Sequence, residues 1–272
     1  MFELDKLVRD NIKRLTPYSS ARNEFNGQSG IFLDANENPF GKYNRYPDPF
    51  QNELKKVLSE IKNVKSENIF LGNGSDEVID LLFRIFCNPG EDKVLTFSPT
   101  YGMYRVSADI NNIELVDVPL SSNFQINLER VLPMLQDALL KLVFICSPNN
   151  PTGNSINESD IKILLSSFKG IVVIDEAYID FSPEQSWSAL IEEHPNLVVM
   201  QTLSKAWGLA GIRMGMAFTN TGIINYLNKV KPPYSISSPN QDIALSAIQN
   251  IESFEEKKQV ILSEGPQGPC FS

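Results

Sequence analysis

Short apolar runs alternate along the middle of the chain with longer stretches in which apolar residues recur every three or four positions. The apolar runs lie near 93–97, 113–118, 142–146, 171–174, 197–200 and 214–218. Runs of this length between polar turns predict buried strands. The longer stretches predict helices at 50–61, 76–87, 101–110, 128–139 and 158–168. This alternation predicts an α/β fold whose mainly parallel sheet is sandwiched between helices.

The two ends of the chain differ from this middle region. A helical pattern from Asn240 to Ser263, with a break near Glu252, runs into a Gly- and Pro-containing tail that cannot continue a helix. We therefore expect three regions. They are an N-terminal helix and polar arm at 1–29, one large domain at 30–240, and the start of a helix with an atypical tail at 241–272.

Composition and charge restrict the classes of function. The formal net charge of −9 opposes binding to nucleic acid or to an anionic membrane surface. No apolar stretch approaches the ~20 residues of a membrane helix, and the charged N-terminus does not resemble a signal peptide. We therefore expect a cytoplasmic protein. The cysteines lack metal-site spacing, and the only histidine, His194, lies in a polar stretch, so we expect neither a metal site nor a hydrolase triad.

The first candidate chemistry lies at 202–215, directly after a predicted strand. Lys205 follows the hydroxyls of Thr202 and Ser204, and Arg213 comes eight positions after it. A lysine amine can form a Schiff base with an aldehyde. Hydroxyls and an arginine can bind a phosphate dianion. Pyridoxal phosphate requires both, although an exposed lysine in a Gly-rich loop is the alternative interpretation.

A carboxylate stands at the end of the predicted strand 171–174, where open α/β sheets place their ligands. Asp175 can pair with a pyridinium nitrogen and keep it protonated, and Tyr178 can reach the phenolic oxygen of the same ring. The alternative is that Asp175 caps the N-terminus of a following helix. This segment alone favours neither interpretation.

Two further segments place polar groups beside predicted strands or helices. Asn150 lies in an Asn-Pro-Thr-Gly turn after the strand near 142–146, where its amide can donate to the ring oxygen of a cofactor. The segment 71–77 is a Gly-rich stretch that opens a helix, which is the arrangement of an anion site. Ser75 and Asp76 also suit helix caps, and both interpretations can hold together because a capped N-terminus still offers backbone donors.

These four segments, in this order, resemble the fold-type I pyridoxal-phosphate aminotransferases of the aspartate aminotransferase superfamily. The resemblance extends over residues 30–260 and implies a large domain of the pyridoxal-phosphate-dependent transferase type. Four more segments resemble the histidinol-phosphate aminotransferase branch, and they lie at 33–41, 45–49, 98–104 and 203–213.

The resemblance implies a role for each matching residue. Lys205 would carry the cofactor and move the proton, with Asp175 at the ring nitrogen and Tyr178 at the ring oxygen as the other catalytic residues. Asn150 would also bind the ring oxygen, and Tyr101 would stack on the ring. The implied phosphate ligands are Ser75, Asp76, Thr202, Ser204 and Arg213.

The resemblance also implies a homodimer with shared active sites, in which Tyr46 reaches the phosphate site of the neighbouring subunit. Tyr18 and Asn36 would contact the substrate, although the segment around Tyr18 matches the branch only in part. The implied reaction of histidine biosynthesis moves the amino group of L-glutamate reversibly to imidazole-acetol phosphate. Its products are L-histidinol phosphate and 2-oxoglutarate.

The C-terminal part of the chain departs from this pattern. Family members continue from the last helix into a small domain whose arginines bind the substrate, and no residue here matches them. We therefore expect a chain that lacks this domain and has little or no activity. The alternatives are an aromatic or aspartate-type aminotransferase, a decarboxylase of the same superfamily, and a partial subunit that is not catalytic.

Overall fold

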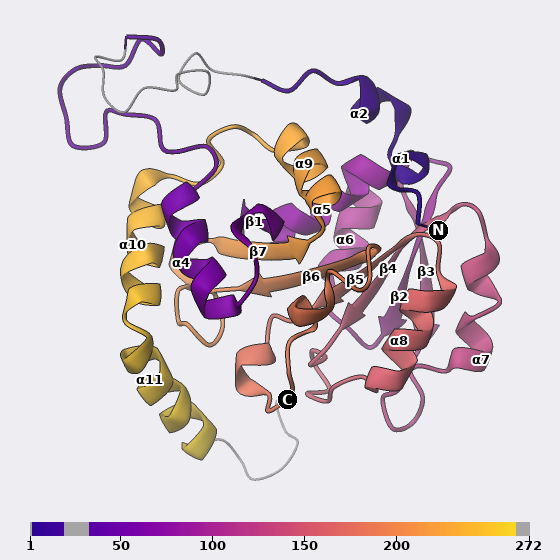
Figure 1. The fold of residues 1–272 in the computed structure, drawn as a ribbon. Coiled ribbons are helices and arrows are strands. Elements are labelled where there is room, and N and C mark those ends of the chain that lie inside the picture. Colours follow the sequence, from indigo (N-terminus) through magenta and orange to yellow (C-terminus); the bar gives the residue numbers. More distant parts are fainter. Residues whose placement is uncertain (1, 19–32, 265–272) are drawn as a thin grey trace.

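The computed structural model describes residues 2–18 and 33–264, and these residues build one seven-stranded sheet with helices on both faces (Figure 1). The strand order is β1-β7-β6-β5-β4-β2-β3. The strands are β1 (Ile69–Asn73), β2 (Lys93–Ser98), β3 (Glu114–Pro119), β4 (Leu140–Cys146), β5 (Ile171–Asp175), β6 (Leu197–Thr202) and β7 (Met214–Thr219). The mainly parallel sheet expected from the sequence is therefore confirmed.

Strand β7 runs antiparallel to both of its neighbours, β1 and β6, whereas the other neighbouring pairs are parallel. This reversal matters for the site. The first residues of β7 lie at the same edge of the sheet as the last residues of β1 and β6. Gly215 pairs with both Gly72 and Thr202.

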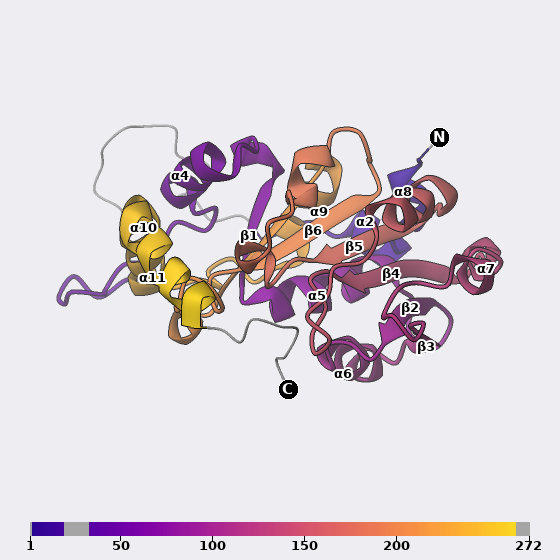
Figure 2. The same ribbon diagram turned by 90° about the horizontal axis from the view of Figure 1, so that it is seen from below.

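Helices cover the sheet in two layers. Figure 2 shows α5 and α6 on one side of the sheet and α4 and α8 on the other. The helices are α1 (Leu4–Leu7), α2 (Asp10–Arg14), α4 (Asn52–Lys62), α5 (Ser75–Phe86), α6 (Met103–Ile110), α7 (Leu128–Val131), α8 (Glu158–Ser167), α9 (Thr221–Val230), α10 (Ser238–Gln249) and α11 (Ile251–Glu264). Within the described residues, no helix is long and apolar enough to cross a membrane.

The two layers explain why the strands are almost continuously apolar. In β5, Val172 and Ile174 pack into the core beneath α4, α8 and α10, while Ile171 and Val173 pack into the core beneath α5, α6 and α9. All four are fully buried. Because burial of such a side chain contributes roughly 1.5–3 kcal/mol, the central strands provide a rigid base for the residues at their ends.

Four local details differ from the expectations. The predicted helix at 128–139 is wrong beyond α7, because Pro133 interrupts it and a 3₁₀ turn follows at Met134–Gln136. Strand β1 was not expected, since Gly72 within it made the segment resemble a loop. Helix α9 was also missed. The break expected near Glu252 occurs at Asn250, between α10 and α11.

Helix α10 packs against α4, and α11 continues beside the loop that follows β6. The ring of Phe254 in α11 stacks on Trp207 in that loop, with 3.8 Å between ring centroids. The division into three regions stays a prediction. Its polar arm at 19–29 and its tail at 265–272 lie outside the described residues.

Candidate active site

One pocket lies at the edge of the sheet where β4, β5 and β6 end and β7 begins. Register alone brings these ends together, since Cys146 pairs with Asp175 and Thr202 pairs with Gly215. Every predicted cofactor residue except Tyr46 lines this pocket. Its lining residues are Ser75, Asp76, Tyr101, Cys146, Asn150, Asp175, Ala177, Tyr178, Thr202, Ser204, Lys205 and Arg213.

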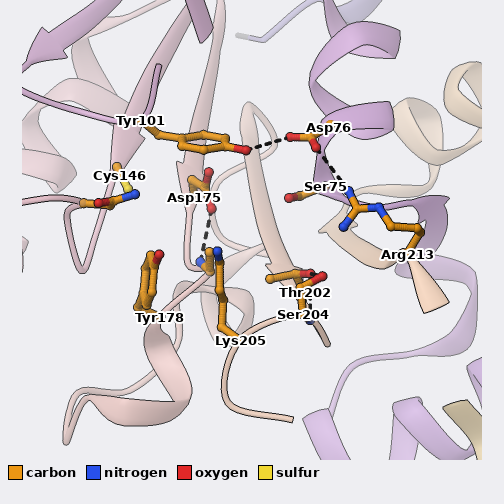
Figure 3. A pocket seen from close by; sticks show the side chains of 12 residues that line it. Ser75, Asp76, Tyr101, Cys146, Asp175, Tyr178, Thr202, Ser204, Lys205 and Arg213 are labelled. Carbon is orange, nitrogen blue, oxygen red and sulfur yellow. Dashed lines mark hydrogen bonds and ion pairs between the residues drawn. The ribbon is translucent and has the colours of Figure 1, made fainter. Parts of the chain in front are cut away.

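Figure 3 shows two groups of side chains with Lys205 between them. We call the first group the β5 end, and it consists of Tyr101, Cys146, Asn150, Asp175, Ala177 and Tyr178. We call the second group the α5 end, and it consists of Ser75, Asp76, Thr202, Ser204 and Arg213. The two ends differ in burial and in how their charges are held.

Asp175 is the buried charge of the β5 end, with 2% of its surface exposed. Its Oδ2 accepts a 2.7 Å hydrogen bond from the hydroxyl of Tyr104, and its Oδ1 accepts one of 3.1 Å from the backbone N–H of Ala177. Burial raises the pKa of Asp175, and these two bonds oppose the rise. The bond from Ala177 is the kind of short-range contact that the capping alternative predicts for Asp175. The carboxylate nevertheless also lines the pocket.

Tyr104 is the residue that the sequence did not reveal. It lies in α6, one helical turn after Tyr101, and it is fully buried. Its ring stacks on Phe144 at 4.9 Å between centroids and meets the ring of Tyr101 edge-on at 5.6 Å. The available signal was an aromatic residue one turn beyond Tyr101, although that spacing equally describes an ordinary core residue.

Tyr101 belongs to the β5 end and makes a hydrogen bond to the α5 end. Its hydroxyl donates to Oδ1 of Asp76 at 3.1 Å. Burial and the neighbouring Asp76 carboxylate raise the pKa of Tyr101, so the phenol keeps its proton and donates it to this bond.

The loop after β6 places Lys205 in the pocket. The backbone N–H of Ser204 donates to Oγ1 of Thr202 at 3.1 Å, and Gly208 closes the turn by donating to the carbonyl of Lys205 at 3.0 Å. Gly208 adopts a φ of 66°, which glycine tolerates without strain. The Lys205 side chain is exposed, and its Nζ lies 5.5 Å from the centroid of the Tyr178 ring.

The α5 end is built around the N-terminus of helix α5. Gly74 is the N-cap and no side chain caps the helix, so the capping alternative for Ser75 and Asp76 is wrong. The first N–H groups of a helix have no partner within the helix, and they carry its positive dipole end. A Cβ on Gly215 would lie 2.2 Å from the Ser75 nitrogen, which shows how closely β7 approaches this terminus.

Arg213 enters the α5 end from the start of β7. Its Nη2 lies 3.3 Å from Oδ2 of Asp76, and its side chain is 47% exposed. A Cβ on Gly74 would lie 2.7 Å from the same Nη2, so Gly74 leaves the space that the guanidinium occupies. The Asp76 carboxylate would repel a phosphate dianion. The carboxylate therefore holds Arg213 and Tyr101, and the group that Asp76 offers an anion is its backbone N–H.

The two hydroxyls of the α5 end contact each other. Oγ1 of Thr202 lies 3.0 Å from Oγ of Ser204 and 3.1 Å from the carbonyl oxygen of Met214. A hydroxyl has one proton to donate, so Thr202 donates to one of these oxygens at a time. Thr202 is buried and Ser204 is half-buried, which leaves the Ser204 hydroxyl the more accessible of the two.

Three predicted residues do not line this pocket. Tyr46 is 49% exposed and stacks on Tyr234 with 4.5 Å between ring centroids. Tyr18 is 68% exposed, and Asn36 lies on the exposed segment that precedes α4. The roles assigned to these three residues stay predictions.

The donor set of the pocket fits pyridoxal phosphate. An amine for the aldehyde, a buried carboxylate for the ring nitrogen, and an amide and a phenol for the ring oxygen line one end or its border. A guanidinium, two hydroxyls and an uncapped helix N-terminus line the other, as a phosphate requires. Within the described residues, no group of three or more His, Cys, Asp or Glu side chains could hold a metal ion.

Comparison with known proteins adds an independent line of argument. The histidinol-phosphate aminotransferase of Cytophaga hutchinsonii is 51% identical over 268 residues, which are 97% of this chain and 77% of that protein. The solved structure of the histidinol-phosphate aminotransferase from Clostridium acetobutylicum matches with a TM-score of 0.73 and 27% identity. That match covers 82% of this chain and 66% of the other.

A second solved structure, the Sinorhizobium meliloti histidinol-phosphate aminotransferase in complex with pyridoxal-5′-phosphate, shares the fold with a TM-score of 0.75 and 24% identity. The match covers 80% of this chain and 60% of that one, so the chain spans less than two thirds of both solved proteins. The sequence pattern described as aminotransferase class I and II matches residues 22–264. Pocket, fold and sequence agree, and the chain belongs to the aminotransferase class I and II family.

Proposed function

We propose that this protein is a pyridoxal-phosphate-dependent aminotransferase that interconverts L-histidinol phosphate and 2-oxoglutarate with imidazole-acetol phosphate and L-glutamate. The observation that carries the proposal is the convergence of Lys205, Asp175 and Arg213 on one pocket. It occurs in a chain that is 51% identical to a histidinol-phosphate aminotransferase. The cytoplasmic location expected from the sequence stays a prediction.

The cofactor is pyridoxal 5′-phosphate, which supplies an aldehyde that joins amines and a ring that withdraws electrons from the substrate α-carbon. At the β5 end, Asp175 would keep the ring nitrogen in its protonated form, because its buried carboxylate favours a cation beside it. Asn150 and Tyr178 would bind the ring oxygen, and Tyr101 would pack against the ring. These roles use the donors and acceptors that line the pocket.

Lys205 would attach the cofactor through its amine, and the same amine, once free, would hold and move a proton at the substrate α-carbon. Its position supports both tasks. The side chain is exposed and projects between the two ends of the pocket, while the turn closed by Gly208 fixes its backbone.

The α5 end binds the phosphate. Arg213 and the first N–H groups of α5, from Ser75 and Asp76, provide positive charge, and Thr202 and Ser204 contribute hydroxyls at the edge of the same space. Because the phosphate does not react, its binding would serve to orient the cofactor toward Lys205.

We further propose that the protein is a homodimer in which Tyr46 reaches the phosphate site of the partner. The segment from 33 to 50 supports this interface. Glu37 braces it from within by accepting from Arg45 and from the backbone N–H of Tyr46. Exposed apolar side chains are typical of interaction surfaces. The large exposed apolar side chains of this segment are Leu33, Phe40, Tyr43, Tyr46 and Phe50.

Sedimentation of the purified chain tests the interface, with Tyr46→Phe and Phe40→Ser as variants. We expect a dimer in the wild type, dissociation in Phe40→Ser, and an intact dimer with weaker cofactor binding in Tyr46→Phe. A monomeric wild type contradicts the interface. A dimer in which Tyr46→Phe binds cofactor normally contradicts only the role of Tyr46.

The cofactor groups do not separate the alternatives, which are an aromatic or aspartate-type aminotransferase, a decarboxylase and a non-catalytic subunit. The specific substrate, with Tyr18 and Asn36 as its contacts, rests on the relatives. An assay with L-glutamate and imidazole-acetol phosphate, beside L-aspartate, L-phenylalanine and a test for released CO₂, separates them. The Cytophaga hutchinsonii relative serves as the reference, and turnover equal to that enzyme contradicts the expectation of little activity.

Lys205→Ala is the decisive variant. Borohydride treatment of the wild type should leave the cofactor covalently on the peptide that contains Lys205, detected by mass spectrometry, and the variant should carry none. Any amino transfer should fall on the order of 10⁴-fold, because both attachment and proton transfer are lost. Lys162→Ala, an exposed lysine in α8, is the matched control. A covalent adduct on another lysine of the variant would show that the assignment is wrong.

A further inference from the structure

The carboxylate of Asp175 is buried, and no cationic side chain among the residues that the structure describes forms an ion pair with it. Burial is the main cause that raises its pKa. Lys205 favours the ionised form from the exposed loop after β6, and Asp76 in α5 opposes it. From β4, the neighbouring Cys146 stays a neutral thiol, since burial raises its pKa to about 12. Hydrogen bonds therefore decide how well the ionised carboxylate is tolerated.

Two donors supply those bonds, and they differ in kind. The Ala177 N–H belongs to the backbone only two residues after Asp175, so it moves together with Asp175. The Tyr104 hydroxyl comes from α6, a different layer of the fold, and makes the shorter bond at 2.7 Å. The Tyr104 hydroxyl is therefore the donor that can fix the position of the carboxylate relative to the rest of the pocket.

Tyr104 cannot swing away from this position. Its ring is fully buried and stacked on Phe144, which stacks in turn on Phe83 of α5 at 5.6 Å. Its other side meets the Tyr101 ring edge-on. A side chain enclosed in this way keeps one rotamer, so its hydroxyl is a fixed donor.

We propose that Tyr104 is a positioning residue of this site, whose buried hydroxyl keeps the Asp175 carboxylate ionised and in one orientation toward the ring nitrogen of the cofactor. The part that concerns the ring nitrogen rests on the proposed function. The part that concerns Asp175 alone does not. Removal of the hydroxyl leaves a buried carboxylate with one hydrogen bond fewer, and the protonated form becomes easier to reach.

The first test uses the cofactor-free protein. The ¹³C resonance of the Asp175 carboxyl, assigned with Asp175→Asn, is followed against pH in the wild type, in Tyr104→Phe and in Tyr226→Phe. Tyr226 is a matched control, because its hydroxyl donates to Asp5 at 3.1 Å outside the pocket. We expect Asp175 of Tyr104→Phe to titrate at least one pH unit higher than in the wild type, and Tyr226→Phe to leave it unchanged.

A second variant keeps the test decisive if Tyr104→Phe does not fold. A chain with 3-fluorotyrosine at position 104 retains the ring and the hydroxyl but donates a stronger hydrogen bond, because fluorine makes the phenol more acidic. Asp175 should then titrate at lower pH than in the wild type. An Asp175 titration that neither Tyr104→Phe nor the fluorinated chain displaces overturns the proposal.

The cofactor-bound protein tests the remaining part. With ¹⁵N-labelled pyridoxal 5′-phosphate, the ring nitrogen of Tyr104→Phe should lose its proton at a pH at least one unit below that of the wild type. Hydrogen bonds to charged groups are worth roughly a ten- to hundred-fold change in such equilibria. Failure of the wild type to bind cofactor defeats the proposed function and leaves the ¹³C result standing. If the ¹³C titration of Asp175 is displaced but the ¹⁵N titration of the ring nitrogen is unchanged, Tyr104 acts on Asp175 and has no effect on the cofactor.

Discussion

At the β5 end of the pocket, Asp175 is 2% exposed and accepts hydrogen bonds from the Tyr104 hydroxyl and the Ala177 backbone N–H. At the α5 end, Arg213 is 47% exposed and faces a single carboxylate at 3.3 Å. The buried end is tied to the core through Tyr104, whereas the exposed end can move its guanidinium into water. An exposed ion pair of this kind contributes at most ~1 kcal/mol to stability, and salt screens it.

The difference separates two tasks. A charge that tunes a reacting ring acts most strongly in a water-excluded place and in a fixed orientation. A charge that grips a phosphate can adjust to its ligand, because the free energy of that contact is gained on binding. We therefore expect changes at the β5 end to affect chemistry and changes at the α5 end to affect affinity.

Among the changes that test this comparison of the two ends, the largest effect should come from Asp175→Asn, which keeps the shape but removes the charge. The rate of α-proton removal from L-glutamate, measured by stopped-flow absorbance, should fall on the order of 10³-fold. Stability in urea should be unchanged or higher, since a buried charge without a cation is costly. Asp137→Asn, at an exposed ion pair with Lys93, is the control. A rate within a few-fold of the wild type would refute the role of Asp175 at the cofactor ring and favour the capping role through Ala177.

The next largest effect should be a pH dependence of stability caused by Glu176, the residue after Asp175. It is 1% exposed and accepts from Ser186, from the backbone of Trp187 and from Gln201. Burial raises its pKa from 4.5 to about 7. Between these values the folded protein holds a proton that the unfolded chain releases. The contribution of Glu176 to stability is therefore full below pH 4.5 and is lost as pH rises toward 7.

Between pH 5 and pH 7.5 the change should amount to about 2 kcal/mol in the free energy of unfolding. Urea unfolding at pH 5 and at pH 7.5 measures it, with Glu176→Gln as the variant that cannot titrate. The variant should lose this part of the pH dependence. If wild type and variant change equally between the two pH values, the slope arises elsewhere and the surroundings of Glu176 are more hydrated than its burial indicates.

The smallest effect should come from Arg213→Gln, and it should concern affinity. Binding of pyridoxal 5′-phosphate should weaken roughly ten- to hundred-fold, the worth of a charge-assisted hydrogen bond. Pyridoxal, which has no phosphate, should bind the variant as it binds the wild type. Arg84→Gln on the same side of the sheet, in α5 and paired with Asp80, is the control. Equal weakening for both ligands would mean that Arg213 supports the pocket rather than the phosphate.

Local patterns in the sequence predicted many of the residues of the site. Lys205, Asp175 and Asn150 each follow an apolar run, and parallel strands end at one edge of a sheet, so their convergence was predictable. Arg213 precedes an apolar run, and only the antiparallel direction of β7 brings it to that edge. The sequence suggested Asp76 as a phosphate ligand, but it gave no sign of the carboxylate contacts to Tyr101 and Arg213. Those partners lie 25 and 137 positions away along the chain.

The sequence by itself determined the α/β alternation, the chemical groups of the pocket and the resemblance to the aminotransferases, because hydrophobic period and short-range turn chemistry are local properties. Only the tertiary structure decided which of two aromatic residues, Tyr101 or Tyr104, bonds to Asp175. It also decided that Glu176 lies in the core and that α5 begins without a side-chain cap. These outcomes depend on how segments that are far apart in the sequence pack together. The spacing of residues along the chain does not specify which side chains become buried or which of them form hydrogen bonds.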